Sequence, residues 1–172
     1  CHVVRSVVVT VDLSACTSMR TMHYMKTGHH AFADCPALER VHWPPNLEVV
    51  GQHVVSGCPK LVTVDLRPCL SLRGVGNYAF ANCPALETVH WPPELEEVGE
   101  RVVSGCPKLL TVDFRECVSL RRISDNALAD CPALETVHWP PGLEDLGKWV
   151  VRNCPKLVTV DLRKCSALRR IG

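Results

Sequence analysis

Two groups of side chains in this sequence could carry chemistry, and each recurs along the chain. Cysteine occurs eleven times in 172 residues, and thiols can form disulfides, bind metal ions or act as nucleophiles. Short segments of the form Thr-Val-Asp alternate with segments of the form Thr-Val-His. Together they would offer the hydroxyl, imidazole and carboxylate groups of a nucleophilic triad, or the ligands of a metal site. Either interpretation depends on the elements that position these side chains.

The spacing of the cysteines shows that the chain is built from repeats. Six cysteines open the words Cys-Pro-Ala-Leu-Glu or Cys-Pro-Lys-Leu, and each word recurs every 48 residues: Cys35, Cys58, Cys83, Cys106, Cys131 and Cys154. Each 48-residue block divides into a 23-residue unit, such as 83–105, and a 25-residue unit, such as 106–130. Both lengths suit one coil of a solenoid. We therefore expect about seven coils in a single domain over residues 1–172.

Within one unit the apolar residues follow two different periods. Residues 86–91, Leu-Glu-Thr-Val-His-Trp, alternate with period two, as in a short strand. Pro92 and Pro93 then end the strand because they lack an amide donor. Residues 95–103 carry apolar side chains every three or four positions, interrupted by Gly99, which predicts a short helical or irregular return segment. One coil should therefore consist of a strand, a corner and a return segment.

These residues resemble the leucine-rich repeat of the BspA type, also called the Treponema type. Its 23-residue pattern has the form Cys-x-x-Leu-x-x-Ile-x-Leu-Pro-x-x-Leu-x-x-Ile-Gly-x-x-Ala-Phe-x-x, and the resemblance recurs seven times in phase over nearly the whole chain. In the unit that begins at residue 83 the matching residues are Cys83, Leu86, Val89, Trp91, Pro92, Leu95, Val98 and Gly99. Ala-Phe stands at 31–32 and 79–80, and the 25-residue units depart from the pattern by two extra residues within 67–72.

The resemblance implies a fold and a function. The fold is an α/β repeat solenoid, a right-handed arc with one parallel β-sheet on its concave face and short helical or irregular return segments. The function is that of a non-enzymatic protein–protein interaction scaffold that needs no cofactor. The alternative is a cell-surface adhesin or host-contact protein. Because the last unit stops at Gly172, before its return segment, we expect the chain to be a fragment of a longer protein.

The cysteines are best interpreted as core residues. The opening cysteines recur where a coil turns, and a small, nearly apolar side chain packs well at such a position. A second set of cysteines recurs at turns in the same way: Cys16, Cys69, Cys117 and Cys165. An odd total, side chains stacked in register and the absence of a Cys-x-x-Cys pair disfavour disulfides and a zinc site. Unpaired thiols and the absence of an Asn-x-Ser/Thr sequon favour an intracellular location, with surface exposure as the alternative.

The alternating strands predict a row of polar pairs on the concave face: Thr10/Asp12, Arg40/His42, Thr63/Asp65, Thr88/His90, Thr111/Asp113, Thr136/His138 and Thr159/Asp161. An enzyme site is disfavoured because a catalytic constellation is singular and lies in a pocket that excludes water. A metal site is disfavoured because parallel side chains splay poorly for tetrahedral ligation. We therefore predict no catalytic or metal-ligating residue, and we expect the row to contact a protein. Its candidate binding residues are Arg40, His42, Asp65, His90, Asp113, His138 and Asp161.

Charge is distributed in layers along the chain. The formal net charge of +1 disfavours nucleic acid as a partner, and no apolar run reaches the roughly 18 residues of a membrane span. The 23-residue units carry ten acidic and four basic residues, and the 25-residue units carry six acidic and twelve basic ones. A basic row of Arg20, Arg73, Arg121 and Arg169 alternates with an acidic row of Glu48, Glu96 and Glu144. Such layers neutralise one another and would allow head-to-tail self-association.

Two irregular positions are further candidates for contacts with a protein. The segment 23–30 is five residues longer than its equivalent, which predicts a protruding loop carrying His23, Tyr24, His29 and His30. The return segments differ between blocks more than the strands do, so recognition could instead use the outer return face. There we expect Trp149 to be more exposed than Trp43, Trp91 and Trp139.

Overall fold

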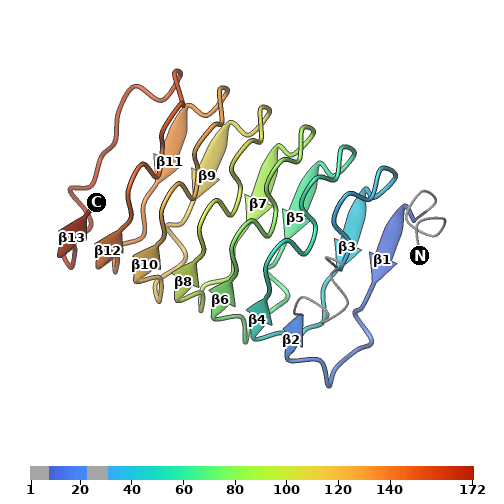
Figure 1. Cartoon of the computed structure of the whole chain (residues 1–172). Coiled ribbons are helices and arrows are strands. Elements are labelled where there is room, and N and C mark those ends of the chain that lie inside the picture. Colours follow the sequence, from blue (N-terminus) through green and yellow to red (C-terminus); the bar gives the residue numbers. More distant parts are fainter. Residues whose placement is uncertain (1–7, 23–30) are drawn as a thin grey trace.

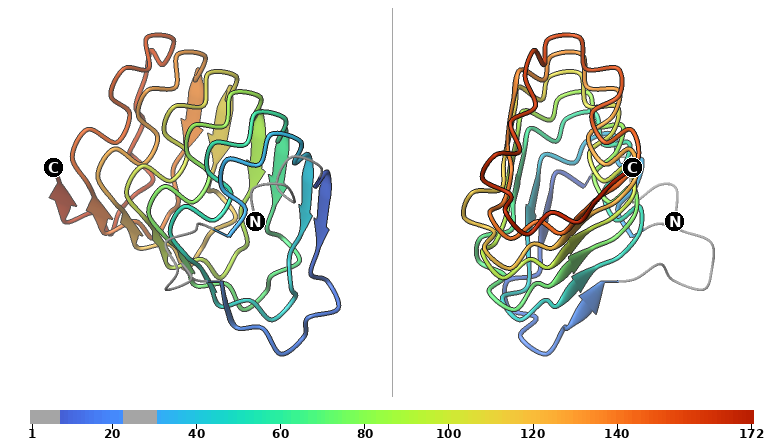
Figure 2. Two further views of the ribbon diagram at one scale, coloured as in Figure 1. Left: turned by 45° about the vertical axis from the view of Figure 1, so that its right-hand side comes forward. Right: turned by 90° about the vertical axis from the view of Figure 1, so that its left-hand side faces the viewer.

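The computed structural model describes residues 8–22 and 31–172, which form a solenoid of short parallel strands. No helix occurs among these residues. Six strands of three residues form a first row: β1 (Thr10–Asp12), β3 (Arg40–His42), β5 (Thr63–Asp65), β7 (Thr88–His90), β9 (Thr111–Asp113) and β11 (Thr136–His138). Seven strands of two residues form a second row: β2 (Thr21–Met22), β4 (Val49–Val50), β6 (Gly74–Val75), β8 (Glu97–Val98), β10 (Arg122–Ile123), β12 (Asp145–Leu146) and β13 (Arg170–Ile171). Figure 1 shows both rows, and Figure 2 shows successive coils lying over one another.

The second row is one continuous parallel sheet. Its order is β2-β4-β6-β8-β10-β12-β13, one strand per coil, so its seven strands bound six full turns. Equivalent residues lie opposite one another in adjacent coils, as Glu97 does to Arg122 and Arg122 to Asp145. The inward residue of each strand except Ile171 is buried. This sheet therefore fixes the register of the whole stack.

The sheet lies in the segments predicted to be helical or irregular returns, so the helical interpretation is wrong and the α/β class becomes an all-β solenoid. Most return-segment amides bond to an adjacent coil rather than within their own segment. The N–H of Val55 donates to the carbonyl of Ala79 at 3.0 Å, and the N–H of Phe80 donates to that of Val102 at 2.9 Å. Apolar residues three or four apart, such as Val98 and Val102, face inward at successive bends of one coil. That spacing imitates a helical period.

The first row occupies the predicted strands but is not the single sheet that was expected. β1 pairs with β3, β5 with β7 and β9 with β11, whereas β3 and β5, and β7 and β9, form no ladder. Both breaks follow a strand that ends in Trp-Pro-Pro. Prolines offer no amide donor and restrict the residue before them, so no ladder continues from Trp43 or Trp91. The seventh predicted strand, at 159–161, does not form, and Val158 beside it is 92% exposed.

Each coil turns through a corner with two residues in the left-handed backbone region. One position holds only the residue types that adopt positive φ most easily: Asp34, Gly57, Asn82, Gly105, Asp130 and Asn153. The other holds Asn126 and four bulkier residues: His53, Tyr78, Arg101 and Trp149. The rings of His53 and Tyr78 stack at 4.7 Å, and the guanidinium of Arg101 lies 5.8 Å from the Tyr78 ring. These contacts offset part of a backbone preference of roughly 1–2 kcal/mol per residue.

A single apolar core runs through the stack, filled mainly by Leu, Val and Cys. Its few large rings lie end to end along the stack. The centroid distances are 6.1 Å from Trp43 to Phe80, 6.3 Å from Phe80 to Trp91, and 5.2 Å from Trp91 to Phe114. Each ring thus packs against rings of neighbouring coils, which joins the thin layers into one core.

The opening cysteines form a column of buried thiols that link successive coils. The Sγ of Cys58 donates to the carbonyl of Phe32 at 3.2 Å, that of Cys83 to Val55 at 3.3 Å, and that of Cys131 to Val103 at 3.3 Å. Nine of the ten described cysteines are buried, Cys16 is half-buried, and none of the ten forms a disulfide. The prediction that the cysteines are core residues is confirmed for those nine. Each thiol satisfies a backbone carbonyl that would otherwise lack a partner at the corner.

Candidate functional site

The polar residues of the first row stand in separate pairs rather than in one continuous row. His42 lies opposite Asp12, His90 opposite Asp65, His138 opposite Asp113, and Arg40 opposite Thr10. The breaks place His90 and Asp113 in different ladders. Between them lies an open hollow of about 560 Å³, to which Thr111 and Trp91 also contribute. Asp161 lies outside the row, in a segment without a strand.

The aspartates of this row are held by residues two positions further along the chain. The guanidinium of Arg115 donates two hydrogen bonds to the carboxylate of Asp113, at 3.0 and 2.6 Å, and Arg67 and Arg163 hold Asp65 and Asp161 in the same way. The hydrogen bonds from Arg115 lower the pKa of Asp113, and the imidazole of His138 lowers it further by its charge.

This geometry leaves little for triad or metal chemistry. A carboxylate shared with a guanidinium is a poor partner for orienting an imidazole as a base. Within 8–22 and 31–172, no group of three or more His, Cys, Asp and Glu residues could hold a metal ion. The first row therefore presents fixed charges and hydroxyls to solvent.

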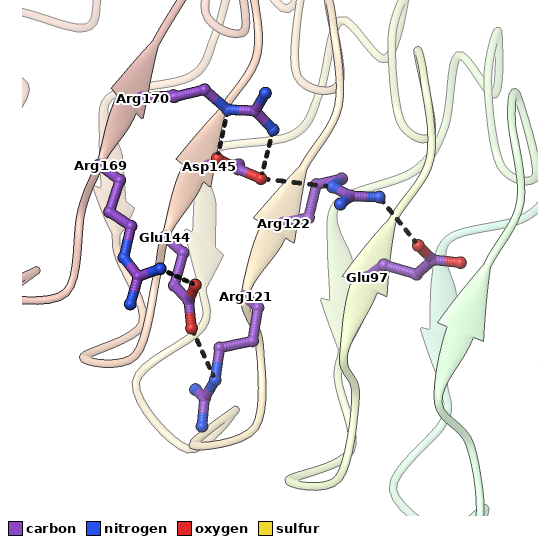
Figure 3. Close-up of polar contacts among 7 residues, drawn as sticks. All are labelled: Glu97, Arg121, Arg122, Glu144, Asp145, Arg169 and Arg170. Carbon is purple, nitrogen blue, oxygen red and sulfur yellow. Dashed lines mark hydrogen bonds and ion pairs between the residues drawn. The ribbon is translucent and has the colours of Figure 1, made fainter.

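The second row carries a denser set of charges, which we call the charged face. It consists of the outward residue of each second-row strand and the residue before it. From β2 to β13 these pairs are Arg20/Thr21, Glu48/Val49, Arg73/Gly74, Glu96/Glu97, Arg121/Arg122, Glu144/Asp145 and Arg169/Arg170. Acidic and basic coils alternate without exception, as predicted from the Arg and Glu rows. Figure 3 shows how the side chains of the last coils point toward one another across the strands.

Two side chains per coil point outward because the backbone bends at this point. The amides of Glu96 and Glu97 both donate to the carbonyl of Arg73, at 2.7 and 3.1 Å. The amides of Arg121 and Arg122 share the carbonyl of Glu96 in the same way. A regular strand would turn one side chain of each pair inward, but two amides that share one acceptor act like a bulge and turn both outward.

The ion pairs of the charged face are exposed, and most of them are long. Arg122 lies 3.8 Å from Glu97 and 3.6 Å from Asp145, and Arg121 lies 3.6 Å from Glu144. The shortest of these ion pairs joins Arg170 to Asp145 by two hydrogen bonds of 2.7 Å, which lower the pKa of that carboxyl. Exposed pairs of this kind stabilise a fold by well under about 1 kcal/mol each.

Trp149 differs from the other three tryptophans of the chain. Trp43, Trp91 and Trp139 are 4–6% exposed, whereas Trp149 is 63% exposed at a corner where its backbone is left-handed. The guanidinium of Arg152 lies 5.9 Å from its ring centroid. Among the described residues no return segment lies over this corner, because Trp149 belongs to the last coil. A large, flat indole is the kind of group that contributes most to protein interfaces.

The arrangement of coils and the comparison with family models agree. A model described as the BspA type leucine rich repeat region matches in six copies, over residues 17–119 and 69–172. The chain belongs to this family. No curated protein sequence matches the chain.

Two solved structures of leucine-rich-repeat proteins are similar to this chain. The leucine-rich-repeat protein TpLRR of T. pallidum is 25% identical, with a TM-score of 0.59, over 86% of this chain and 77% of that one. A leucine-rich-repeat protein from Bacteroides ovatus ATCC 8483 is 27% identical, with a TM-score of 0.51, over 81% of this chain and 43% of that one. The chain thus spans less than half of the second protein.

The structure brings some of the candidate residues together and separates others. The His and Asp candidates meet only within pairs, and Trp149 lies apart from them on a corner. His23, Tyr24, His29 and His30 lie outside the described residues. Sequence reasoning missed Arg115 and its equivalents, although the spacing Asp-x-Arg was visible. It also missed the second charged position in the coils from β8 onward, of which Arg122 is an example. No helix among the described residues is long and apolar enough to cross a membrane.

Proposed function

We propose that the chain is a non-enzymatic scaffold that binds a protein partner, and that the corner around Trp149 is its principal contact. Family membership supports a repeat scaffold for protein interaction. The observation that carries the proposal is the residue type at this corner, because Trp149 offers a large indole where the equivalent positions hold His53, Tyr78, Arg101 and Asn126. The indole has few rotamers to lose on binding, since the corner and Arg152 already restrict it.

The first row supports a binding role rather than a catalytic one. Its carboxylates accept hydrogen bonds from arginines or, at Asp12, from Ser14, its hydroxyls repeat along an open surface, and its hollows are open to solvent. None of these features activates a nucleophile or excludes water. An adhesive role at a cell surface would be the same activity with a partner on another cell. The identity of the captured partner distinguishes it from a role inside the cell.

Affinity capture with three baits tests the proposal. The baits are the wild-type chain, Trp149→Ser and the control Leu70→Ser, which removes an apolar side chain of similar exposure (65%) at another corner. Mass spectrometry should identify a protein retained by the wild type and by the control but lost with Trp149→Ser. Retention of the same proteins by all three baits would show that the Trp149 corner is not the contact.

A further inference from the structure

The charged face has a symmetry that a second copy of the same chain can use. The pairs at β8, β10, β12 and β13 carry two charges each, with signs that alternate: acidic at Glu96/Glu97, basic at Arg121/Arg122, acidic at Glu144/Asp145 and basic at Arg169/Arg170. At β4 and β6 the alternation continues with one charge per coil, from Glu48 and Arg73. Successive coils are one strand spacing apart, about 4.8 Å.

A twofold axis that runs parallel to the strands, midway between β8 and β10, brings two such faces together with every charge opposed. The axis reverses the order of the coils, so the β8 pair of one copy faces the β10 pair of the other. By the same operation β6 faces β12 and β4 faces β13. Glu97 then lies over Arg122, Arg73 over Glu144, and Glu48 over Arg169, and each contact occurs twice in an isologous dimer.

Charge disfavours several other arrangements, an axis between β6 and β8 opposes fewer charges, and an axis between β10 and β12 joins fewer coils. An axis that passes through a strand instead of between two strands would place like charges opposite one another along the whole face. An axis along the stack would place each charged pair opposite the same pair of the second copy, so like charges would again face one another. Like charges directly opposite one another are unfavourable.

The shape of the face fits the midway arrangement. Gly74 and Val49 leave the outer surface of β6 and β4 low, with a hollow of about 320 Å³ between the neighbouring arginines and glutamates. These low positions would face Asp145 and Arg170 of the second copy. The existing ion pairs orient the side chains but leave them accessible to a second copy, because Arg122 and Glu97 remain 56% and 61% exposed.

We propose that the charged face is a self-association surface that forms a face-to-face, antiparallel dimer of this chain through the midway axis. The dimer is weak and sensitive to salt, because its contacts are mainly between charges that lie near solvent. This surface lies on the second row and does not rest on the role proposed for Trp149.

Sedimentation equilibrium tests the proposal with the wild type at about 20 mM and about 300 mM NaCl. The expected result is a reversible dimer at low salt whose dissociation constant rises at least tenfold at high salt. A wild-type chain that stays monomeric at low salt, up to about 0.5 mM protein, would overturn the proposal, since dissociation constants above about 1 mM correspond to negligible specific association.

Variants separate the proposed geometry from net charge. Arg121→Glu with Arg122→Glu places acidic pairs opposite one another across the axis and should weaken association at least tenfold. The control Lys60→Glu with Lys108→Glu changes the net charge equally at exposed sites outside the charged face and should leave association unchanged. Equal weakening by both would show a general charge effect and contradict the proposal.

An exchange of two pairs supplies the sharpest outcome. A variant with Glu96→Arg, Glu97→Arg, Arg121→Glu and Arg122→Glu keeps the composition and the symmetry of charge about the axis. It should dimerise with itself but not with the wild type. If circular dichroism shows that this variant is unfolded, the exchange of Glu97 and Arg122 alone replaces it. A folded exchange variant that stays monomeric, or that pairs with the wild type as well as with itself, would refute the midway axis.

Discussion

Alkaline pH should unfold this protein because of its buried thiols. Burial raises the pKa of several cysteines above their ordinary value near 9: to about 12 for Cys58, Cys117 and Cys131, and to about 11 for Cys69 and Cys83. In the unfolded chain these thiols ionise near pH 9, whereas in the folded chain they stay protonated to higher pH. The folded state therefore binds more protons between pH 9 and 12. Stability from this source is complete below pH 9 and falls as the pH rises.

The size of the effect follows from the same values. At pH 10 a thiol whose pKa is about 9 unfolded and 11 or 12 folded has lost about 1.4 kcal/mol of its stabilising contribution. Five such thiols together account for about 7 kcal/mol, which is comparable to the whole stability of an ordinary domain, roughly 5–15 kcal/mol. We expect the free energy of unfolding to be nearly flat from pH 7 to 8.5 and to collapse near pH 10.

Urea unfolding followed by circular dichroism, under reducing conditions from pH 7 to 10.5, measures this dependence. Other groups also titrate in the range, so a double variant isolates the thiols. Cys58→Ala with Cys131→Ala should reduce the loss between pH 8 and 10 by about 3 kcal/mol, since two thiols that each lose about 1.4 kcal/mol are gone. An unchanged slope in the variant, or a wild type as stable at pH 10 as at pH 7, would refute the assignment of the effect to these cysteines.

Three further predictions concern individual contacts. Gly105→Ala should lower stability by about 1–2 kcal/mol, because its φ of +72° and a clash with Asn82 oppose a Cβ. Gly74→Ala should be nearly neutral, since the nearest atom to its new Cβ would be 3.5 Å away. Thermal unfolding of the two variants measures the difference in stability, and equal losses would contradict the prediction. Arg115→Ala should raise the pKa of the carboxyl it holds, measured by carboxyl NMR titration, and an unchanged titration would show that the guanidinium is not its main partner. Leu95→Ala should cost about 2–5 kcal/mol in urea unfolding because the side chain is fully buried, and a loss below about 1 kcal/mol would mean that the coil collapses around the cavity.

Much of the coil architecture could be predicted from repetition alone. A sequence segment that recurs every 48 residues, such as the one that begins at Cys83, must occupy equivalent places in a stack. The burial of its side chains then follows from their apolar character. The alternation of residues 86–91 located β7, although the Pro residues after it also break the ladder to β9. The helical interpretation of 95–103 was wrong because bends of a coil and turns of a helix both bring an apolar residue inward every three or four positions.

The charged face shows where one-dimensional reasoning stops. Arg121 and Glu144 could be placed in one row because they share a position in the repeat. Arg122 could not, since simple strand alternation turns it away from its neighbour. Only the two amides that share one carbonyl of the previous coil turn both side chains outward. Likewise, the guanidinium of Arg115 folds back on its own strand, which removes the carboxylate that a catalytic interpretation of the row would need.

The most direct test of the proposed binding role is the affinity of the captured partner, purified and measured by calorimetry against three forms of the chain. The forms are the wild type, Trp149→Ser and Leu70→Ser. Removal of a central interface aromatic weakens binding by about 2 kcal/mol or more. The account predicts a dissociation constant at least tenfold higher for Trp149→Ser and unchanged for Leu70→Ser. Equal affinities for all three forms would contradict it.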